Sequence, residues 1–275
     1  ISKFLLTFNA GWHSAHTLQL MKSIVYVLIL VVLTACSTGR KPIDADSNFA
    51  VSSDTLKLYD SARQREIPLA VYQPVTDKKR KYQQVVIFSH GYGENKGGDY
   101  LAYSYLTAFL ASKGYFVVSI QHELATDSLL PVTGIPQVVR RPFWERGADN
   151  ILFVINELQK NYPGISFGDI TLIGHSNGGD MTALFPQKYP DIVSKIITLD
   201  NRRMALPRTN HPKVYSLRSS DQPADEAVLP TAEEQKKFGM IIIQLANTRH
   251  NDMDDHANEE QRKEIRTYIM RFLNR

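Results

Sequence analysis

The stretch ITLIGHSNGG, residues Ile170–Gly179, decides the fold expected for this chain. Its apolar start predicts a short buried strand, and the residues after Gly178 follow at helical spacing. Between strand and helix lies G-x-S-x-G, the pattern of a nucleophile elbow, in which a sharp turn exposes a serine at the sheet edge. The pattern therefore predicts Ser176 as a nucleophile with a strained backbone, facing the positive end of the following helix. A glycine-rich turn around an ordinary serine is the alternative.

Strands and helices alternate over most of the remaining chain. Continuous apolar runs predict strands covered on both faces, at Val85–Ser89, Tyr115–Ile120, Val193–Leu199, Lys213–Leu217 and Met240–Leu245. Helical patterns accompany them, at Asp99–Lys113, Trp144–Asn161, Thr231–Phe238 and Ala257–Leu273. Two further segments alternate as the strands of an edge hairpin, Thr55–Tyr59 and Ile67–Tyr72. This order predicts an α/β fold with a mostly parallel central sheet and helices on both faces.

A serine hydroxyl is a poor nucleophile until a base takes its proton. His250 directly follows the last predicted strand, in a loop that would return to the elbow. His256 lies at the start of the closing helix and is the weaker candidate. We therefore expect His250 to be the base, with a solvated loop histidine as the alternative interpretation.

Four segments stand in a recognisable order along the chain. They are FSHGYG at Phe88–Gly93, the GHSNGG elbow, LDNRRMALP at Leu199–Pro207 and HNDMD at His250–Asp254. This set resembles the platelet-activating-factor acetylhydrolase and chlorophyllase branch of the α/β-hydrolases. The resemblance implies the α/β-hydrolase fold and hydrolysis of carboxylic esters through an acyl-enzyme. The short link 201–212 cannot form a large cap domain between its two strands, so the pocket is expected to be open.

The acid that would orient the histidine has three candidates. Many α/β-hydrolases place it in the loop where Asp225 begins a D-x-x-V-x-P stretch, and Asp221 lies just before this stretch. In the acetylhydrolase-like branch the acid lies in an L-D segment after the strand that follows the elbow. That segment corresponds to Leu199 and Asp200. We expect Asp200 to be the acid, with Asp225 and Asp221 as the alternatives.

The HGYG segment at His90–Gly93 resembles the loop that builds the oxyanion hole of α/β-hydrolases. A tetrahedral intermediate needs two donors aimed at its oxygen, and we expect the backbone N–H groups of Tyr92 and Asn177. A glycine turn that merely closes a strand is the alternative. Three other histidines lie near these motifs: we expect His90 and His122 to support nearby loops and His175 to pack inside the elbow.

Residues 21–35 have the pattern of a secretory signal, with a basic start, a short apolar core and small residues at its end. The apolar run Ile24–Leu33 is too short for an ordinary transmembrane helix. LTAC at Leu33–Cys36 resembles the bacterial lipobox, which implies cleavage before Cys36 and its lipidation. We therefore expect a protein anchored through Cys36 to a membrane of the bacterial cell envelope, with a plain signal peptide as the alternative.

The other boundaries follow from this signal. Met21 is a better start than Ile1, so residues 1–20 are interpreted as translated upstream sequence. Residues 36–50 are polar and are expected to form a tether, and 51–275 to form the hydrolase domain. Cys36 is the single cysteine, so no intramolecular disulfide is expected.

Composition narrows the possible partners. The chain has 275 residues, of which 43% are hydrophobic, enough for one domain with a sizeable core. The net charge is +4 without a basic patch, so no nucleic-acid partner is expected. No spacing of metal ligands is present, and we expect neither a metal nor an organic cofactor.

The expected substrate is a small-molecule or lipid-like ester. The apolar residues of the Leu124–Pro142 loop are expected to form the wall for an acyl or aromatic group: Leu129, Leu130, Val132, Ile135, Val138 and Val139. A loop packed on the core is the simpler interpretation of this segment. A peptidase on the same fold, and a binding lipoprotein with a vestigial elbow, are the two alternative functions.

Overall fold

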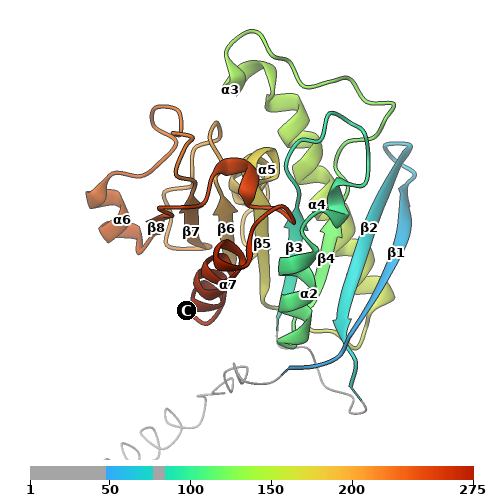
Figure 1. Cartoon of the computed structure of the whole chain (residues 1–275). Coiled ribbons are helices and arrows are strands. Elements are labelled where there is room, and N and C mark those ends of the chain that lie inside the picture. The colour runs from blue at the N-terminus through green and yellow to red at the C-terminus, as the bar shows by residue number, and fades with distance from the viewer. Residues whose placement is uncertain (1–47, 77–83) are drawn as a thin grey trace, which may run out of the picture. The chain divides into compact units, whose positions relative to one another are not determined.

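A computed structural model describes residues 48–76 and 84–275. This part of the chain forms an eight-stranded sheet with the order β1-β2-β4-β3-β5-β6-β7-β8 (Figure 1). Neighbouring strands from β4 to β8 run parallel. Their bounds are β3 Val85–Ser89, β4 Phe116–Ile120, β5 Ile170–His175, β6 Lys195–Leu199, β7 Lys213–Arg218 and β8 Ile241–Gln244. The predicted parallel sheet is therefore confirmed.

The predicted edge hairpin is also present. β1 (Val51–Asp60) pairs antiparallel with β2 (Arg65–Pro74), and β2 pairs antiparallel with β4. Most side chains of β1 are exposed or partly exposed, whereas β2 is largely buried. The alternation in the sequence therefore matches an outer strand that has solvent on one side.

Helices cover both faces of the sheet. In Figure 1, α2 (Ser104–Ser112) and α7 (Glu259–Leu273) lie in front of the strands, and α4 (Arg141–Asn161) and α5 (Ser176–Lys188) lie behind them. Each face carries its own apolar core, one built with α4 and α5 and the other with α2 and α7. The two cores hold β5 from both sides, which fixes the elbow at its end.

The predicted helix Asp99–Lys113 is interrupted, so this prediction is wrong in part. A short turn of 3-10 helix, η1 (Asp99–Leu101), comes first, and α2 begins only at Ser104. The carboxylate of Asp255 accepts hydrogen bonds from the backbone N–H groups of Ser104 and Tyr105. This cap comes from a residue about 150 positions later in the chain, so local sequence could not show where α2 begins.

The remaining helices are short. The Leu124–Pro142 segment, expected to be irregular, contains the single turn α3 (Pro136–Val139), and α4 starts within it at Arg141. α6 (Ala232–Phe238) precedes β8, and η2 (His250–Asp252) follows it. The link from β6 to β7 contains no helix, in agreement with the expected absence of a large cap there.

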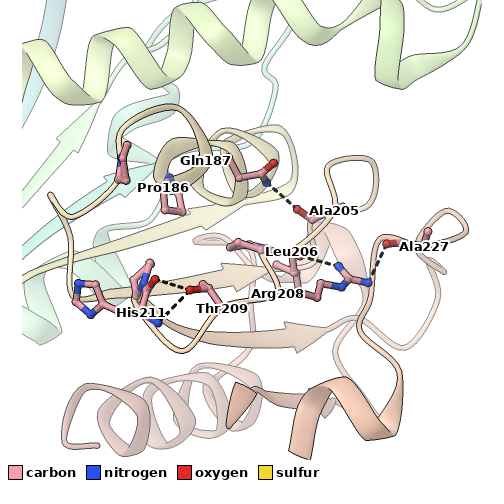
Figure 2. Close-up of a pocket in the computed structure, with 11 residues that line it drawn as sticks. Pro186, Gln187, Ala205, Leu206, Arg208, Thr209, His211 and Ala227 are labelled. Carbon is pink, nitrogen blue, oxygen red and sulfur yellow. Dashed lines mark hydrogen bonds between the residues drawn. The ribbon is translucent and has the colours of Figure 1, made fainter. Parts of the chain in front are cut away.

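A surface groove of about 630 Å³ lies beside this link. The end of α5 forms one side with Pro186 and Gln187, and residues 205–209 of the link form the other (Figure 2). Gln187 Nε2 donates to the carbonyl of Ala205, at 3.2 Å, across the two sides. α5 rises about 15 Å between Ser176 and Pro186, so the groove is remote from the elbow.

Candidate active site

Ser176 occupies the sharp turn between β5 and α5. Its φ angle is 53°, a left-handed conformation that is unusual for a residue other than glycine. Gly174 and Gly178, on either side of the serine, leave no room for a side chain. A Cβ atom at Gly174 would overlap the backbone of Gly178, and one at Gly178 would overlap the carbonyl groups of Ser89 and His90. The turn thus has the strained elbow geometry that the sequence predicted.

His250 lies between Ser176 and Asp200. Its Nε2 is 2.9 Å from Oγ of Ser176, and its Nδ1 is 2.6 Å from Oδ2 of Asp200. Ser176 begins α5, Asp200 follows β6, and His250 begins η2. Since β5, β6 and β8 are parallel strands of one sheet, their carboxyl ends meet at one edge and bring the three residues together.

Asp200 is fully buried and has a complete set of donors. Oδ1 accepts the backbone N–H of Ser219 and pairs with Nη2 of Arg218 at 2.8 Å; Oδ2 also accepts the Ser219 hydroxyl. Burial by itself raises the pKa of Asp200, but the hydrogen bond with His250, the charge of Arg218 and the donors of Ser219 outweigh it and lower this pKa. The carboxylate therefore stays ionised beside the imidazole.

The two alternative aspartates lie elsewhere in the same region. Asp221 accepts the backbone N–H of His250 at 2.7 Å and does not reach its ring. Asp225 pairs with Arg203 and accepts a hydrogen bond from Gln137 at 2.7 Å. Both stabilise loops around the site. His256, the weaker candidate for the base, is exposed and pairs with Asp254.

Tyr92 and Asn177, the expected oxyanion donors, line one cavity of about 190 Å³ together with Ser176. Asn177 is the second residue of α5, where backbone N–H groups have no partner within the helix. Its side chain is held from two sides: Nε1 of Trp144 donates to its Oδ1, and its Nδ2 donates to Oε1 of Glu123. Burial raises the pKa of Glu123.

His175 does more than pack inside the elbow. Its Nδ1 is 2.7 Å from the Tyr103 hydroxyl, which also accepts the backbone N–H of Gly91. Its Nε2 is 3.1 Å from the carbonyl oxygen of His250. Burial, and then the charge of His250, lower the pKa of His175 to about 3. A neutral His175 with its proton on Nε2 therefore connects the HGYG loop to the His250 loop.

His90 and His122 support their loops, as expected. The backbone N–H of His122 donates to Nε2 of His90, and Nε2 of His122 lies 2.9 Å from the Ser89 hydroxyl. Both rings are buried. They brace the ends of β3 and β4 beneath the HGYG loop.

The Leu124–Pro142 loop contributes one of the six expected apolar residues to the cavity. Leu130 lines it, and its backbone N–H donates to the Tyr92 hydroxyl at 3.0 Å. The expectation is wrong for Leu129, Val132, Ile135 and Val138, which are largely exposed, and Val139 is not among the lining residues. The loop runs away from the sheet around α3 (Figure 1), which agrees with the exposure of these four side chains.

Several side chains in the site carried no signal in the sequence. Tyr103, Glu123, Trp144 and Arg218 act through contacts between separate segments that no motif marks, and Arg140 lines the cavity beside Ser176. The arginines following Asp200 were visible within the LDNRRMALP segment, and their position next to an acid candidate was the one available hint.

Within residues 48–76 and 84–275, no helix is both long and apolar enough to cross a membrane. In the same part of the chain, no group of three His, Cys, Asp or Glu side chains is arranged to hold a metal ion. The predicted signal, the lipidated Cys36 and most of the tether lie outside the described residues.

Comparison with known proteins finds structural similarity without sequence similarity. No protein-family model and no curated protein matches the chain. A bacterial heroin esterase matches with a TM-score of 0.60 at 14% identity, over 91% of this chain and 89% of that one. An esterase from the fungus Rhizomucor miehei gives 0.60 at 13% identity, over 97% and 92% of the two chains.

An acylaminoacyl peptidase gives a TM-score of 0.61 at 16% identity, over 83% of this chain and 42% of that one. These similarities, together with the strand order and the elbow at the end of β5, show one architecture. The chain has the α/β-hydrolase fold, as its sequence predicted.

Proposed function

We propose that this protein is a serine hydrolase that cleaves carboxylic esters. The observation that carries the proposal is the position of His250, with Nε2 at 2.9 Å from the Ser176 hydroxyl and Nδ1 at 2.6 Å from Asp200. A nucleophile, a base and an orienting acid in hydrogen-bond contact are the minimum set for acyl transfer. The esterases among the structural neighbours agree with this reaction class.

The proposed reaction proceeds in two halves. Ser176 Oγ attacks the acyl carbon while His250 takes its proton, and His250 then protonates the leaving alcohol. Water repeats the attack on the acyl-enzyme with the same histidine as base. Asp200 holds the imidazole with its proton on Nδ1 and stabilises the imidazolium. The backbone N–H groups of Tyr92 and Asn177 are the proposed donors to the oxyanion.

Labelling with a fluorophosphonate probe tests the nucleophile directly. The wild-type protein should be labelled, and the Ser176→Ala variant should not. A folded wild-type protein that resists the probe would instead favour the alternative, a binding protein with a vestigial elbow.

A peptidase on the same fold is the second candidate, favoured by the similarity to an acylaminoacyl peptidase. The catalytic residues of the two activities are shared, so the site alone does not separate them. Turnover of nitrophenyl esters without turnover of acylated amino-acid amides supports the esterase. Comparable turnover of both would favour the peptidase.

Membership of the acetylhydrolase-like branch and attachment to a membrane are two further proposals that start from the sequence. The contact of His250 with Asp200, rather than with Asp225 or Asp221, supports the acetylhydrolase-like branch, in which the acid occupies this position. LTAC at Leu33–Cys36 supports a lipoprotein whose anchor keeps the hydrolase on a membrane of the cell envelope. A small-molecule or lipid-like ester is the proposed substrate.

A further inference from the structure

We propose that the substrate of this site is a small ester that carries a carboxylate, which Arg202 and Arg140 bind beside Ser176. This inference rests on the proposed function, because it concerns the ligand of the same site. Its starting point is the cavity that contains Ser176, which has a volume of about 190 Å³. Three of its eight lining residues are arginines: Arg140, Arg202 and Arg203.

Two of these arginines lack an acidic partner. Arg203 pairs with Asp225, whereas no carboxylate of the described residues lies within ion-pair distance of Arg140 or Arg202. Arg140 donates through Nε to the carbonyl of Pro131 at 3.1 Å, and among the described residues no hydrogen bond or ion pair engages the outer nitrogens of its guanidinium group. Free donors on a guanidinium fork are suited to a planar carboxylate.

The charge of Arg202 interacts with charged groups on several sides of the site. Burial and the neighbouring Arg203 both lower the pKa of Arg202, whereas the charges of Asp200, Asp180 and Asp225, none of them in ion-pair contact with it, act in the opposite sense. The charge of Arg202 also contributes to the low pKa of His175 inside the elbow. A partly buried cation without a partner is costly, and a bound anion would remove that cost.

One acidic residue also lines the cavity. Asp180 accepts backbone N–H groups from Arg203 and Met204, and burial raises its pKa to about 6. If Asp180 is counted as ionised and Arg203 as neutralised by Asp225, one positive charge remains unpaired. The cavity therefore has an excess of positive charge next to the nucleophile.

Two helix ends add to this positive field. Arg140 is the residue before α4 and Ser176 begins α5, so two residues that line the cavity lie at helix N-termini. The positive end of a helix favours an anion nearby. The cavity holds roughly six water molecules at ~30 Å³ each, which suits a short carbon chain ending in a carboxylate.

Binding to an inactive variant tests the proposal without requiring turnover. In the Ser176→Ala protein, calorimetry compares monomethyl glutarate with methyl glutaramate, the neutral amide of nearly the same shape. We expect the acid to bind at least about tenfold more tightly, in line with a charge-assisted hydrogen bond. The preference should be lost when Arg202→Gln is added and should decrease with salt.

Arg141→Gln is the matched control, because Arg141 is adjacent to Arg140 but pairs with Glu145 outside the cavity. The preference for the acid should survive this change. Arg140→Gln provides a second test from the other side of the cavity if Arg202→Gln fails to fold. Equal binding of the acid and the amide, or a preference that survives both cavity variants, overturns the proposal.

The experiments can refute the carboxylate site and the proposed hydrolase independently of each other. A protein that is labelled by fluorophosphonate but binds acid and amide equally retains its proposed function and loses the carboxylate site. A preference for the acid in a protein that resists labelling keeps the anion site and removes the hydrolase.

Discussion

The side chains of His250 and Asp200 meet through a contact of 2.6 Å between Nδ1 and Oδ2, although 50 positions separate them in the chain. The backbone of the same histidine is held by a different carboxylate, since Asp221 accepts its N–H at 2.7 Å. The loop is thus held at two points, and of the two aspartates only Asp200 contacts a ring nitrogen.

Asp200→Asn should therefore reduce ester turnover by about ten-thousandfold, because an amide can hold the imidazole in the wrong tautomer. Asp225→Asn should have far less effect, since this residue contacts Arg203 and Gln137. Steady-state kinetics with a nitrophenyl ester measure both variants, and circular dichroism checks their fold. A severe loss in Asp225→Asn with an active Asp200→Asn would contradict the assignment.

Ser176→Ala and His250→Ala should each remove most ester turnover, again by about ten-thousandfold or more. The double variant should be hardly worse than either single one, because His250 acts only through the Ser176 hydroxyl 2.9 Å away. His256→Ala is the control, as this exposed histidine pairs with Asp254 away from the site. Independent, multiplicative losses would argue against a shared nucleophile and base.

The pKa of His175 predicts a pH-dependent stability. Burial lowers it to about 3 from an ordinary value near 6.5, so the unfolded chain binds a proton in this interval that the folded chain does not. The free energy of unfolding should thus fall as pH falls from about 6.5 towards 3, by about 1.4 kcal/mol per pH unit for this residue.

His175→Gln should reduce the slope of the free energy of unfolding against pH by an amount that corresponds to about one bound proton. Denaturant unfolding of both proteins at a series of pH values measures the two slopes. The difference between the slopes removes the contributions that both proteins share, such as those of His122 and Asp180. Between about pH 4 and 6 Asp180 acts in the opposite sense, because burial raises its pKa to about 6. Identical slopes in the two proteins would show that His175 titrates normally in the folded state.

Gly178→Ala should destabilise the protein by more than about 3 kcal/mol, since its Cβ atom would overlap the backbone of Ser89 and His90. Gly164→Ala is the matched control, because nothing lies within 4 Å of a Cβ atom at that position. It should be neutral or slightly stabilising, by less than about 1 kcal/mol. Thermal or denaturant unfolding distinguishes the two, and equal effects would contradict this close packing of α5 against the end of β3.

Cys36→Ser should abolish acylation and release the protein from membranes, if LTAC is processed as a lipobox. Metabolic labelling with a fatty-acid analogue and intact-mass measurement of the mature chain provide the test. A mature protein with an unmodified thiol at Cys36, or with a different first residue, would exclude a lipid anchor at this position.

Local patterns in the sequence determined most of the fold. Uninterrupted apolar runs predicted the parallel strands, because a strand covered on both faces has no polar side to alternate with. G-x-S-x-G at Gly174–Gly178 predicted the elbow, since its geometry depends on glycines close to the serine in the chain. The start of α2 could not be predicted, because Asp255 caps it from a distant segment.

The assembly of the site was decided by the tertiary structure. Asp200, Asp221 and Asp225 all follow neighbouring strands, so the sequence left three acids open; the packing of the loops places one at the imidazole ring and the others at a backbone amide and an arginine. The same holds for Arg140 and Arg202, which are 62 positions apart and share a cavity with Ser176. The spacing of residues within a short segment determines turns and strands. The neighbours of a buried side chain come from distant segments, so they depend on how the whole sheet and its loops assemble.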